Sequence, residues 1–249
     1  MNLIIDIGNT RAKLVVFDKD SVKELVYSDS NTLEELPALV GKHAFEKGIL
    51  STVGHIGEKA EQQLQSLPFP LVRLSSNTPL PMPLLWRRRG ETEAFTLPST
   101  MGADRIAALV GAKASMPGSA LLIVDAGTCV TYEIIDEEGY YIGGNIAPGL
   151  QMRLKAMHEH TALLPLVPAD GDKPEVGYDT HTAMRSGAAL GLQYEIEGYI
   201  RYWKTQYPSL QVIMTGGDTM DFQPDLRPII HHDNYLVPKG LNATLNALR

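Results

Sequence analysis

Residues 3–18 read LIIDIGNTRAKLVVFD, and residues 122–136 repeat the same pattern as LIVDAGTCVTYEIID. Each stretch is an apolar β-rich run that ends in aspartate and is followed by a glycine turn, a threonine and a second apolar run. This pattern predicts a strand, a tight turn and a second strand. Asp6 and Asp125 are 119 residues apart, nearly half of the 249-residue chain. A duplication into halves 1–120 and 121–249 would give that spacing, and so would two unrelated hairpins by chance.

The segments around the two hairpins predict an α/β fold. Helical periodicity and cap residues favour helices, and short apolar runs favour strands at 49–53 and 210–214. The expected helices cover residues 32–48, 57–66, 101–115, 179–204 and 240–249. Residues 75–99 are rich in Ser, Pro and Arg without a period, which predicts a long functional or mobile loop. Strands followed by helices in both halves are typical of α/β architecture.

Composition excludes several classes of protein. Apolar residues make up 44% of the chain and the net charge is −7, so we expect a folded core and neither a nucleic-acid partner nor an anionic membrane. The single cysteine, Cys129, excludes an internal disulfide framework. The start MNLIID lacks the basic region of a secretion signal, and no apolar run reaches the length of a membrane span. The expected compartment is the cytoplasm.

The first glycine turn is a candidate phosphate site. A glycine lets backbone amides approach phosphate oxygens, and the threonine adds a hydroxyl donor. Asp6, at the end of the strand, offers the oxygen ligand that Mg²⁺ prefers. Arg11 and Lys13 share one face of the following strand because side chains alternate there. The candidate residues are Asp6, Gly8, Asn9, Thr10 and Lys13. The alternative is an ordinary hairpin, since Asp and Gly are common turn residues.

The second turn repeats this design with Asp125 as a metal ligand and Gly127 and Thr128 at the phosphates. Two such turns facing one another could hold a nucleotide phosphate chain and Mg²⁺, as phosphoryl transfer requires. Gly216 and Gly217 follow the later strand and would let the backbone pass close to a nucleotide, although a Gly-Gly pair at a strand end is a weak signal. Neither G-x-x-x-x-G-K-[ST] nor G-x-G-x-x-G is present.

A third candidate site lies where the long loop meets the helix at 101–115. Its residues are Gly102, Ala103, Asp104 and Arg105. Asp104 could accept the proton of a hydroxyl group, and Arg105 could pair with a carboxylate. These two roles would suit a hydroxy-acid substrate. The alternative is a charged first turn in which Asp104 favours the helix dipole.

These segments, in this order, resemble the type III pantothenate kinases over nearly the whole chain. The pairing of GADR, preceded by proline, with GGNIAPG is far more specific than either Asp-X-Gly turn. The matching motifs are DIGNT at 6–10, F-x-x-P-x-x-x-GADR at 95–105, DAGT at 125–128, GGNIAPG at 143–149, GYDT at 177–180, MRSG at 184–187, TGGD at 215–218 and KGLN at 239–242.

The resemblance implies a duplicated actin-like (ribonuclease H-like) fold, with two similar halves around a nucleotide cleft. It implies ATP-dependent phosphorylation of pantothenate, the first step of coenzyme A synthesis, with Mg²⁺ and a monovalent cation such as K⁺ or NH₄⁺. It also implies a homodimer. By position, Asp104 is the expected catalytic base, Arg105 the carboxylate contact, Gly102 and Ala103 substrate neighbours, and Thr180 a contact from the partner subunit.

Two positions depart from the family. Phe95 stands where the family often has tyrosine, so a hydroxyl contact to substrate is lost there, and Lys13 is not shared across the family. Two alternatives also stay open. One is another actin-like kinase acting on a sugar or carboxylic acid, and the other is a non-catalytic nucleotide-dependent regulator on the same fold.

Overall fold

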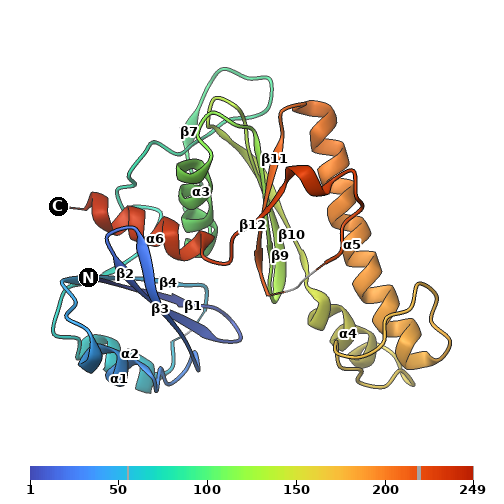
Figure 1. Cartoon of the computed structure of the whole chain (residues 1–249), viewed down its shortest axis with the longest axis horizontal. Coiled ribbons are helices and arrows are strands. Elements are labelled where there is room, and N and C mark those ends of the chain that lie inside the picture. The colour runs from blue at the N-terminus through green and yellow to red at the C-terminus, as the bar shows by residue number, and fades with distance from the viewer. Residues whose placement is uncertain (55, 218–219, 249) are drawn as a thin grey trace. The chain divides into compact units, whose positions relative to one another are not determined.

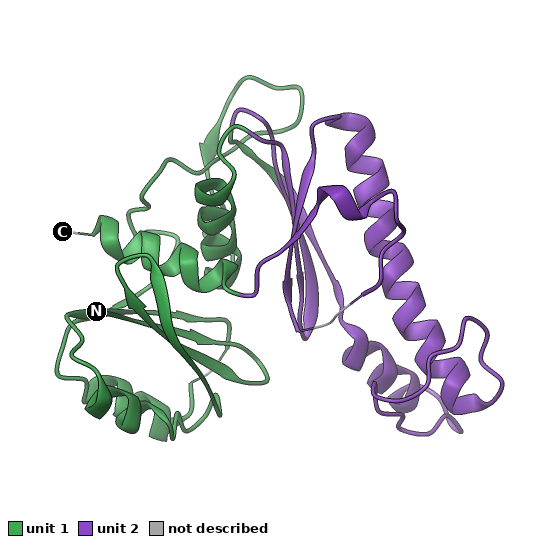
Figure 2. Ribbon diagram, viewed as in Figure 1, with its two compact units in different colours: residues 1–118, 139–142, 235–249 green, residues 119–138, 143–234 purple. Residues whose placement is uncertain are grey.

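A computed structural model describes residues 1–54, 56–217 and 220–248. The chain forms two compact units (Figure 2). The first contains residues 1–118, 139–142 and 235–249, and the second contains residues 119–138 and 143–234. The final helix therefore packs within the first unit. The proposed descent of the chain from two halves, 1–120 and 121–249, stays a prediction.

Both units contain strands and helices (Figure 1). The strands are β1 (Asn2–Ile7), β2 (Ala12–Asp18), β3 (Ser21–Ser28), β4 (Lys47–Thr52), β5 (Leu71–Arg73), β6 (Leu85–Trp86), β7 (Phe95–Thr96), β8 (Leu121–Ala126), β9 (Cys129–Ile135), β10 (Tyr141–Pro148), β11 (Gln211–Gly216) and β12 (Ile230–His232). The helices are α1 (Leu36–Lys42), α2 (Glu58–Gln65), α3 (Ala103–Ser115), α4 (Leu150–Glu159), α5 (Thr180–Gln206), the 3₁₀ helix η1 (Arg227–Ile229) and α6 (Leu236–Ala247).

The first unit is built on a sheet with the strand order β3-β2-β1-β4-β5. β1 pairs antiparallel with β2 and parallel with β4, and β5 continues the parallel side. Alternate residues of β1 (Leu3, Ile5 and Ile7) are buried against α1 and α2. The opposite face meets α6, where the Asn2 amide donates to Asn242 Oδ1 at 2.8 Å. The unit is thus a sheet between two helical layers.

Two glycines let α3 and α6 pack with their backbones in contact. A Cβ at Gly240 would lie 1.8 Å from the carbonyl oxygen of Ala107, and one at Gly111 would lie 2.4 Å from that of Leu236. Helices that approach so closely need residues without side chains at the contact. This packing fixes the beginning of α3, which carries Asp104 and Arg105.

The second unit repeats the strand order of the first, as β10-β9-β8-β11-β12. β8 pairs antiparallel with β9 and parallel with β11, and β11 pairs parallel with β12. β8 and β1 therefore occupy the same central position, and each ends in one of the two aspartate turns. β10 begins in the first unit, where Tyr141 pairs with Trp86 of β6. The repeat visible in the sequence thus extends to the order of five strands.

The long helix α5 runs along one face of the sheet of the second unit (Figure 1). Its N-cap is Asp179, whose side chain accepts a hydrogen bond from the Thr182 amide at 2.7 Å in a capping box. On the covered face, the buried Tyr132 hydroxyl donates to Glu195 of α5 at 2.7 Å. Arg153 of α4 donates to the other oxygen of Glu195 at 2.6 Å.

Most of the predicted elements are present with shifted ends. The helix expected over 32–48 is only seven residues long, from Leu36 to Lys42. Pro37 lies in its first turn, where proline favours the beginning of a helix. The loop predicted over 75–99 contains two short strands, β6 and β7, which pair with each other. Among the described helices, none carries the length of apolar sequence that a bilayer crossing requires.

Candidate active site

The first aspartate turn lies at the carboxyl end of β1 in the first unit. Asp6 is the penultimate residue of that strand. The Gly8 amide donates to the Arg11 carbonyl at 3.2 Å, which leaves Asn9 and Thr10 exposed at the tip of the turn. The Ser30 hydroxyl donates to the Gly8 carbonyl at 2.9 Å and so fixes the base of the turn. The tip is therefore accessible to a ligand while its base is fixed.

The two cations beyond this turn have different surroundings. Lys13 lies directly opposite Asp6 in the antiparallel register, so the two side chains share one face of the sheet. The Arg11 guanidinium stacks on the ring of Tyr27 at 4.1 Å from its centroid. Lys13 is therefore the cation placed beside Asp6, and Arg11 is held against an aromatic ring.

The second aspartate turn, in the second unit, is shorter, because Ala126 pairs with Val130 whereas Ile7 pairs with Ala12 in the first. Asp125 is again the penultimate residue of its strand, and the Gly127 amide donates to the Cys129 carbonyl at 3.0 Å. The Gly149 amide donates to the Thr128 carbonyl at 3.1 Å. A Cβ at Gly149 would lie 2.2 Å from the Gly127 oxygen, so the end of the GGNIAPG segment supports this turn directly.

Gly216 and Gly217 lie beside the second turn. Gly216 has φ +101, and a Cβ there would lie 2.3 Å from the Ala126 carbonyl oxygen. Only glycine adopts this conformation without strain in so close a contact. The Gly217 amide donates to the same Ala126 oxygen at 3.0 Å. The structure thus brings both glycines to the Asp125 turn, whereas Asp218 of the TGGD motif is outside the described residues.

The beginning of α3 carries the proposed base and carboxylate contact. Gly102 is the N-cap, and a Cβ there would lie 2.6 Å from Asp104 Oδ1, so the glycine leaves room for the carboxylate. The Arg105 amide donates to Asp104 Oδ1 at 2.8 Å. Burial raises the pKa of Asp104, and the hydrogen bond and charge of Arg105 only partly oppose this. A raised pKa in a cleft is typical of a group that exchanges protons.

An open cavity of about 680 Å³ lies in front of this helix start, within the first unit. The ends of β4 and β5 and the segment leading into α3 form its walls. The lining residues are Thr52, Val53, Gly54, Leu74, Ser75, Ser76, Ser99, Met101, Gly102 and Ala103. Asn9 of the first turn borders Gly54, since a Cβ at that glycine would lie 3.6 Å from Asn9 Oδ1. Ligands of α/β proteins bind at the carboxyl ends of strands, and this cavity lies at the carboxyl ends of β4 and β5.

Phe95 belongs to the first unit and Thr180 to the second. Phe95 is on β7, 43% exposed, with its ring centroid 5.7 Å from that of Trp86. Thr180 is the exposed first residue of α5 in the second unit. Its position is about 22 Å along the helix from Glu195, where α5 contacts Arg153 and Tyr132.

The residues present fit Mg²⁺ held jointly with a nucleotide. In the described part of the chain, no group of three or more His, Cys, Asp or Glu side chains is arranged to hold a metal. Mg²⁺ is usually bound by one or two carboxylates together with substrate phosphates and water, rather than by a protein cage. Asp6 and Asp125, each at the end of a central strand, are carboxylates of that kind.

Sequence reasoning missed several residues of this region. Thr52, Ser75, Ser76 and Ser99 line the cavity, but isolated hydroxyl residues in loops carry no pattern. Gly149 belongs to a motif that we quoted, yet its contact with the second turn joins segments about twenty residues apart and is not visible from spacing. The tyrosine that contacts Arg105, Tyr141, was not singled out either.

Comparison with protein families identifies one family. A family model described as type III pantothenate kinase matches residues 2–202. A type III pantothenate kinase of Bacteroides fragilis is 49% identical over 246 residues, which cover 99% of this chain and 98% of that protein. One from Phocaeicola vulgatus is 43% identical over 246 residues, with the same coverage of 99% and 98%.

Solved structures share the fold at low identity. A Campylobacter jejuni protein assigned to the Baf family of transcriptional activators has a TM-score of 0.56 and 18% identity, and the match covers 98% of this chain and 97% of that one. A Sinorhizobium meliloti protein assigned as a 2-dehydro-3-deoxygalactonokinase has a TM-score of 0.53 and 14% identity, covering 100% and 99%. These likenesses, together with the repeated five-strand order, confirm the expected actin-like α/β fold.

Proposed function

The chain belongs to the type III pantothenate kinase family, and from this premise we propose how its residues carry out the reaction. The enzyme transfers the γ-phosphoryl group of ATP to pantothenate, giving 4′-phosphopantothenate and ADP in coenzyme A biosynthesis. The observation that carries the assignment of roles is the beginning of α3. There a carboxyl group with a raised pKa and an arginine sit side by side next to an open cavity.

Asp104 is proposed as the general base. It accepts the proton of the 4′-hydroxyl group as that oxygen attacks the γ-phosphorus and ADP leaves. Arg105 is proposed to bind the carboxylate at the other end of the substrate, and Gly102 and Ala103 to line the substrate pocket, as they line the cavity. Phe95 is proposed as an apolar substrate contact, consistent with its exposed ring.

The two aspartate turns are proposed as the phosphate-binding parts, one in each unit. Exposed turn tips with fixed bases suit phosphate oxygens, because backbone amides and hydroxyls can donate there. Bound Mg²⁺ would neutralise the charge that develops during transfer, and Asp6 and Asp125 are its proposed ligands. The nucleotide contacts are proposed at Gly8, Asn9, Thr10, Lys13, Gly127, Thr128, Gly216 and Gly217. A monovalent cation, K⁺ or NH₄⁺, is proposed by resemblance alone.

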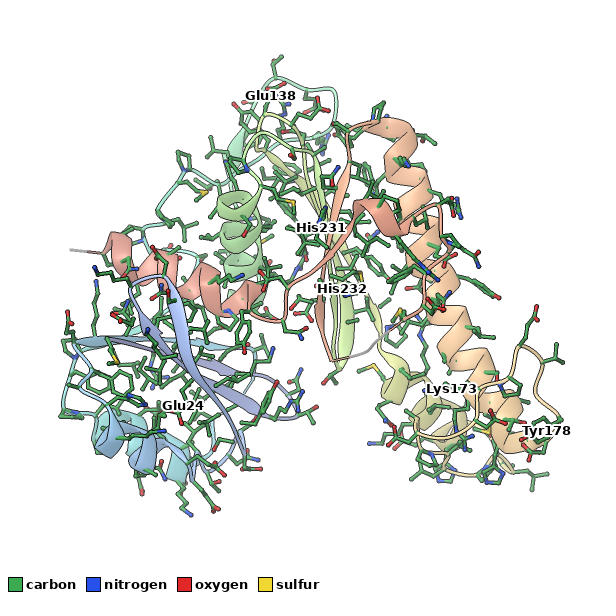
Figure 3. All side chains as sticks on the ribbon, in the orientation of Figure 1. Glu24, Glu138, Lys173, Tyr178, His231 and His232 are labelled. Atoms are coloured by element: carbon green, nitrogen blue, oxygen red, sulfur yellow. The ribbon has the colours of Figure 1, made fainter. Side chains whose placement is uncertain are left out.

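A homodimer with a shared active site is proposed for the second unit. Four large apolar side chains are exposed in the segment between α4 and α5, namely Leu163, Leu166, Val176 and Tyr178. Figure 3 places Tyr178 and Lys173 in this segment, beside the beginning of α5. Exposed apolar groups of this kind mark contact surfaces. Thr180 follows directly at the beginning of α5, and its contact with the substrate of a second copy is proposed by resemblance alone.

One assay tests the function. ADP release is measured with ATP, Mg²⁺ and K⁺, with and without pantothenate, against a panel of hydroxy acids and sugars. We expect release that depends on pantothenate and exceeds that with any other acceptor. A preference for a sugar would favour the alternative actin-like kinase, and the absence of transfer to every acceptor would favour a non-catalytic regulator.

A further inference from the structure

Arg105 has a fixed partner that the proposed reaction does not account for. Its Nη2 donates a hydrogen bond to the hydroxyl oxygen of Tyr141 at 3.1 Å. Tyr141 is the first residue of β10 and only 3% exposed, although it is far from Arg105 in the sequence. A buried tyrosine hydroxyl normally has a polar partner, and here that partner is the arginine proposed to meet the substrate.

Tyr141 is itself held rigidly. Its Cα pairs with that of Trp86 on β6, and its carbonyl accepts the Arg87 amide at 3.0 Å. Two residues earlier, the Gly139 carbonyl accepts a hydrogen bond from Lys113, in the last turn of α3, at 2.9 Å. Both ends of α3 are therefore fastened to residues 139–141, and the tyrosine hydroxyl has little freedom to move.

The chemistry of this contact suits an arginine that must recognise an anion. A guanidinium carries five N–H donors in one plane, so anchoring one of them sets the direction of the others. The tyrosine hydroxyl is uncharged and does not neutralise the guanidinium as a carboxylate would. Orienting the side chain in advance also lowers the entropy lost when a ligand binds.

We propose that Tyr141 is a positioning residue that aims the Arg105 guanidinium at the substrate carboxylate and so sets the preference for pantothenate over uncharged analogues. The inference rests on the proposed function of Arg105. The simpler role for the contact is structural, since the same hydrogen bond also fastens the beginning of α3 to β10. The two roles differ in one measurable respect. Positioning affects only substrates that carry the carboxylate.

The test compares pantothenate with pantothenol, in which a hydroxymethyl group replaces the carboxylate. kcat and KM are measured for both acceptors, and pantothenol is also measured as an inhibitor against pantothenate. The variants are Tyr141→Phe, Arg105→Gln and the double substitution. Tyr140→Phe is the matched control, because Tyr140 is the neighbouring tyrosine and its ring stacks with Arg87, 4.2 Å from the guanidinium carbon to the ring centroid.

We expect Tyr141→Phe to raise the KM for pantothenate about 3- to 10-fold, the effect of one lost hydrogen bond, with little change in kcat. The KM for pantothenol should be unaffected. The ratio of kcat/KM for pantothenate to kcat/KM for pantothenol should therefore fall by the same factor. Tyr140→Phe should leave the preference unchanged. In the Arg105→Gln background the tyrosine substitution should have no further effect on it, since the two residues act as one unit.

An equal loss on both substrates in Tyr141→Phe, with the preference intact, would overturn the inference and leave the structural role. If Arg105→Gln narrows the preference while Tyr141→Phe does not, the inference alone fails. If Arg105→Gln also keeps the preference, the proposed carboxylate contact fails and the inference with it. Because both substrates are measured on one preparation, their ratio does not depend on how much of a variant is folded.

Discussion

Asp104 combines two properties that oppose each other. Its burial favours the neutral form, whereas a general base must be ionised to accept a proton. The Arg105 amide and the Arg105 charge favour the ionised form but do not outweigh burial. In its proposed role, Asp104 therefore lowers the stability of the fold in exchange for proton transfer. One substitution separates the two effects.

Asp104→Asn should lower kcat by about 10²- to 10⁴-fold, the usual contribution of a positioned base. The amide has nearly the same shape and can still accept the Arg105 amide hydrogen, but it cannot accept a proton from the substrate. Steady-state ADP release at saturating pantothenate measures the effect, and the KM for MgATP serves as a control that should change little. Turnover close to that of the wild type would exclude Asp104 as the base.

The same variant should be more stable than the wild type at neutral pH. A raised folded-state pKa means that the stabilising contribution of the protonated carboxyl is present below the unfolded pKa and lost as the pH rises through the folded value. At pH 7 the buried carboxylate therefore destabilises the fold, and asparagine removes that cost. We expect Tm to rise by about 2–4 °C for each 1 kcal/mol gained, and the gain to shrink near the ordinary aspartate pKa of about 4.

A contrasting aspartate controls for this measurement. Asp179 caps α5, and hydrogen bonds from Thr182 lower the pKa of that carboxyl. Its stabilising contribution is present above the unfolded pKa and is lost on acidification. Asp179→Ala should therefore lower Tm at neutral pH, the opposite sign to Asp104→Asn. Equal shifts for both variants would mean that the loss of a negative charge, and not burial, decides the outcome.

At the scale of elements, the close contact between α3 and α6 leads to a prediction about packing. Gly240→Ala should destabilise the protein by at least about 1–3 kcal/mol, because its Cβ would lie 1.8 Å from the Ala107 carbonyl and force the helices apart. Gly198→Ala should stabilise it by about 0.5–1 kcal/mol, because the residue lies on the exposed face of α5 and an added Cβ would meet nothing within 4 Å beyond the nearby backbone of its own helix. Denaturant unfolding measures both, and a neutral Gly240→Ala would contradict the close contact.

Elements defined by neighbouring residues could be predicted from the sequence. The hairpins at 3–18 and 122–136 follow from an apolar run, a glycine turn and a second run, and each appears as paired strands. The helix over 179–204 was predictable because Asp179 marks its start. Contacts between distant segments were not predictable. The packing of α6 against α3 and the pairing of β10 with β6 depend on shape complementarity that no local pattern records.

The candidate site divides in the same way. Asp6, Asp125 and Asp104 could be proposed because carboxylates beside glycine turns or at a helix start have recognisable spacing. Gly149 and Tyr141 could not, since each acts on a residue far away in the chain, Thr128 and Arg105 respectively. Family resemblance supplied the roles of Phe95 and Thr180, for which the surroundings within one chain offer no independent argument.

At the scale of the whole molecule, the proposed dimer decides whether one chain is sufficient for catalysis. Thr180 is exposed at the start of α5, next to the apolar segment that contains Leu163 and Tyr178. The start of a helix favours an anionic ligand, and a partner's substrate carries a carboxylate. Thr180→Arg should disrupt the site to which this residue belongs, and subunit mixing identifies that site.

Two inactive variants, Asp104→Asn and Thr180→Arg, should regain activity when they are mixed and allowed to exchange subunits. If Thr180 acts in the partner's pocket, each mixed dimer has one site with both defects and one site with neither. Equal mixing then restores about a quarter of wild-type activity, assuming two-fold symmetry. Asp104→Asn mixed with Asp6→Ala is the control, because both residues belong to the first unit of one chain and every site keeps a defect. If exchange is verified by mass-tagged subunits and the first pair also recovers nothing, Thr180 belongs to its own chain's site or to none. Recovery in the first pair alone would mean that every active site contains residues from both chains.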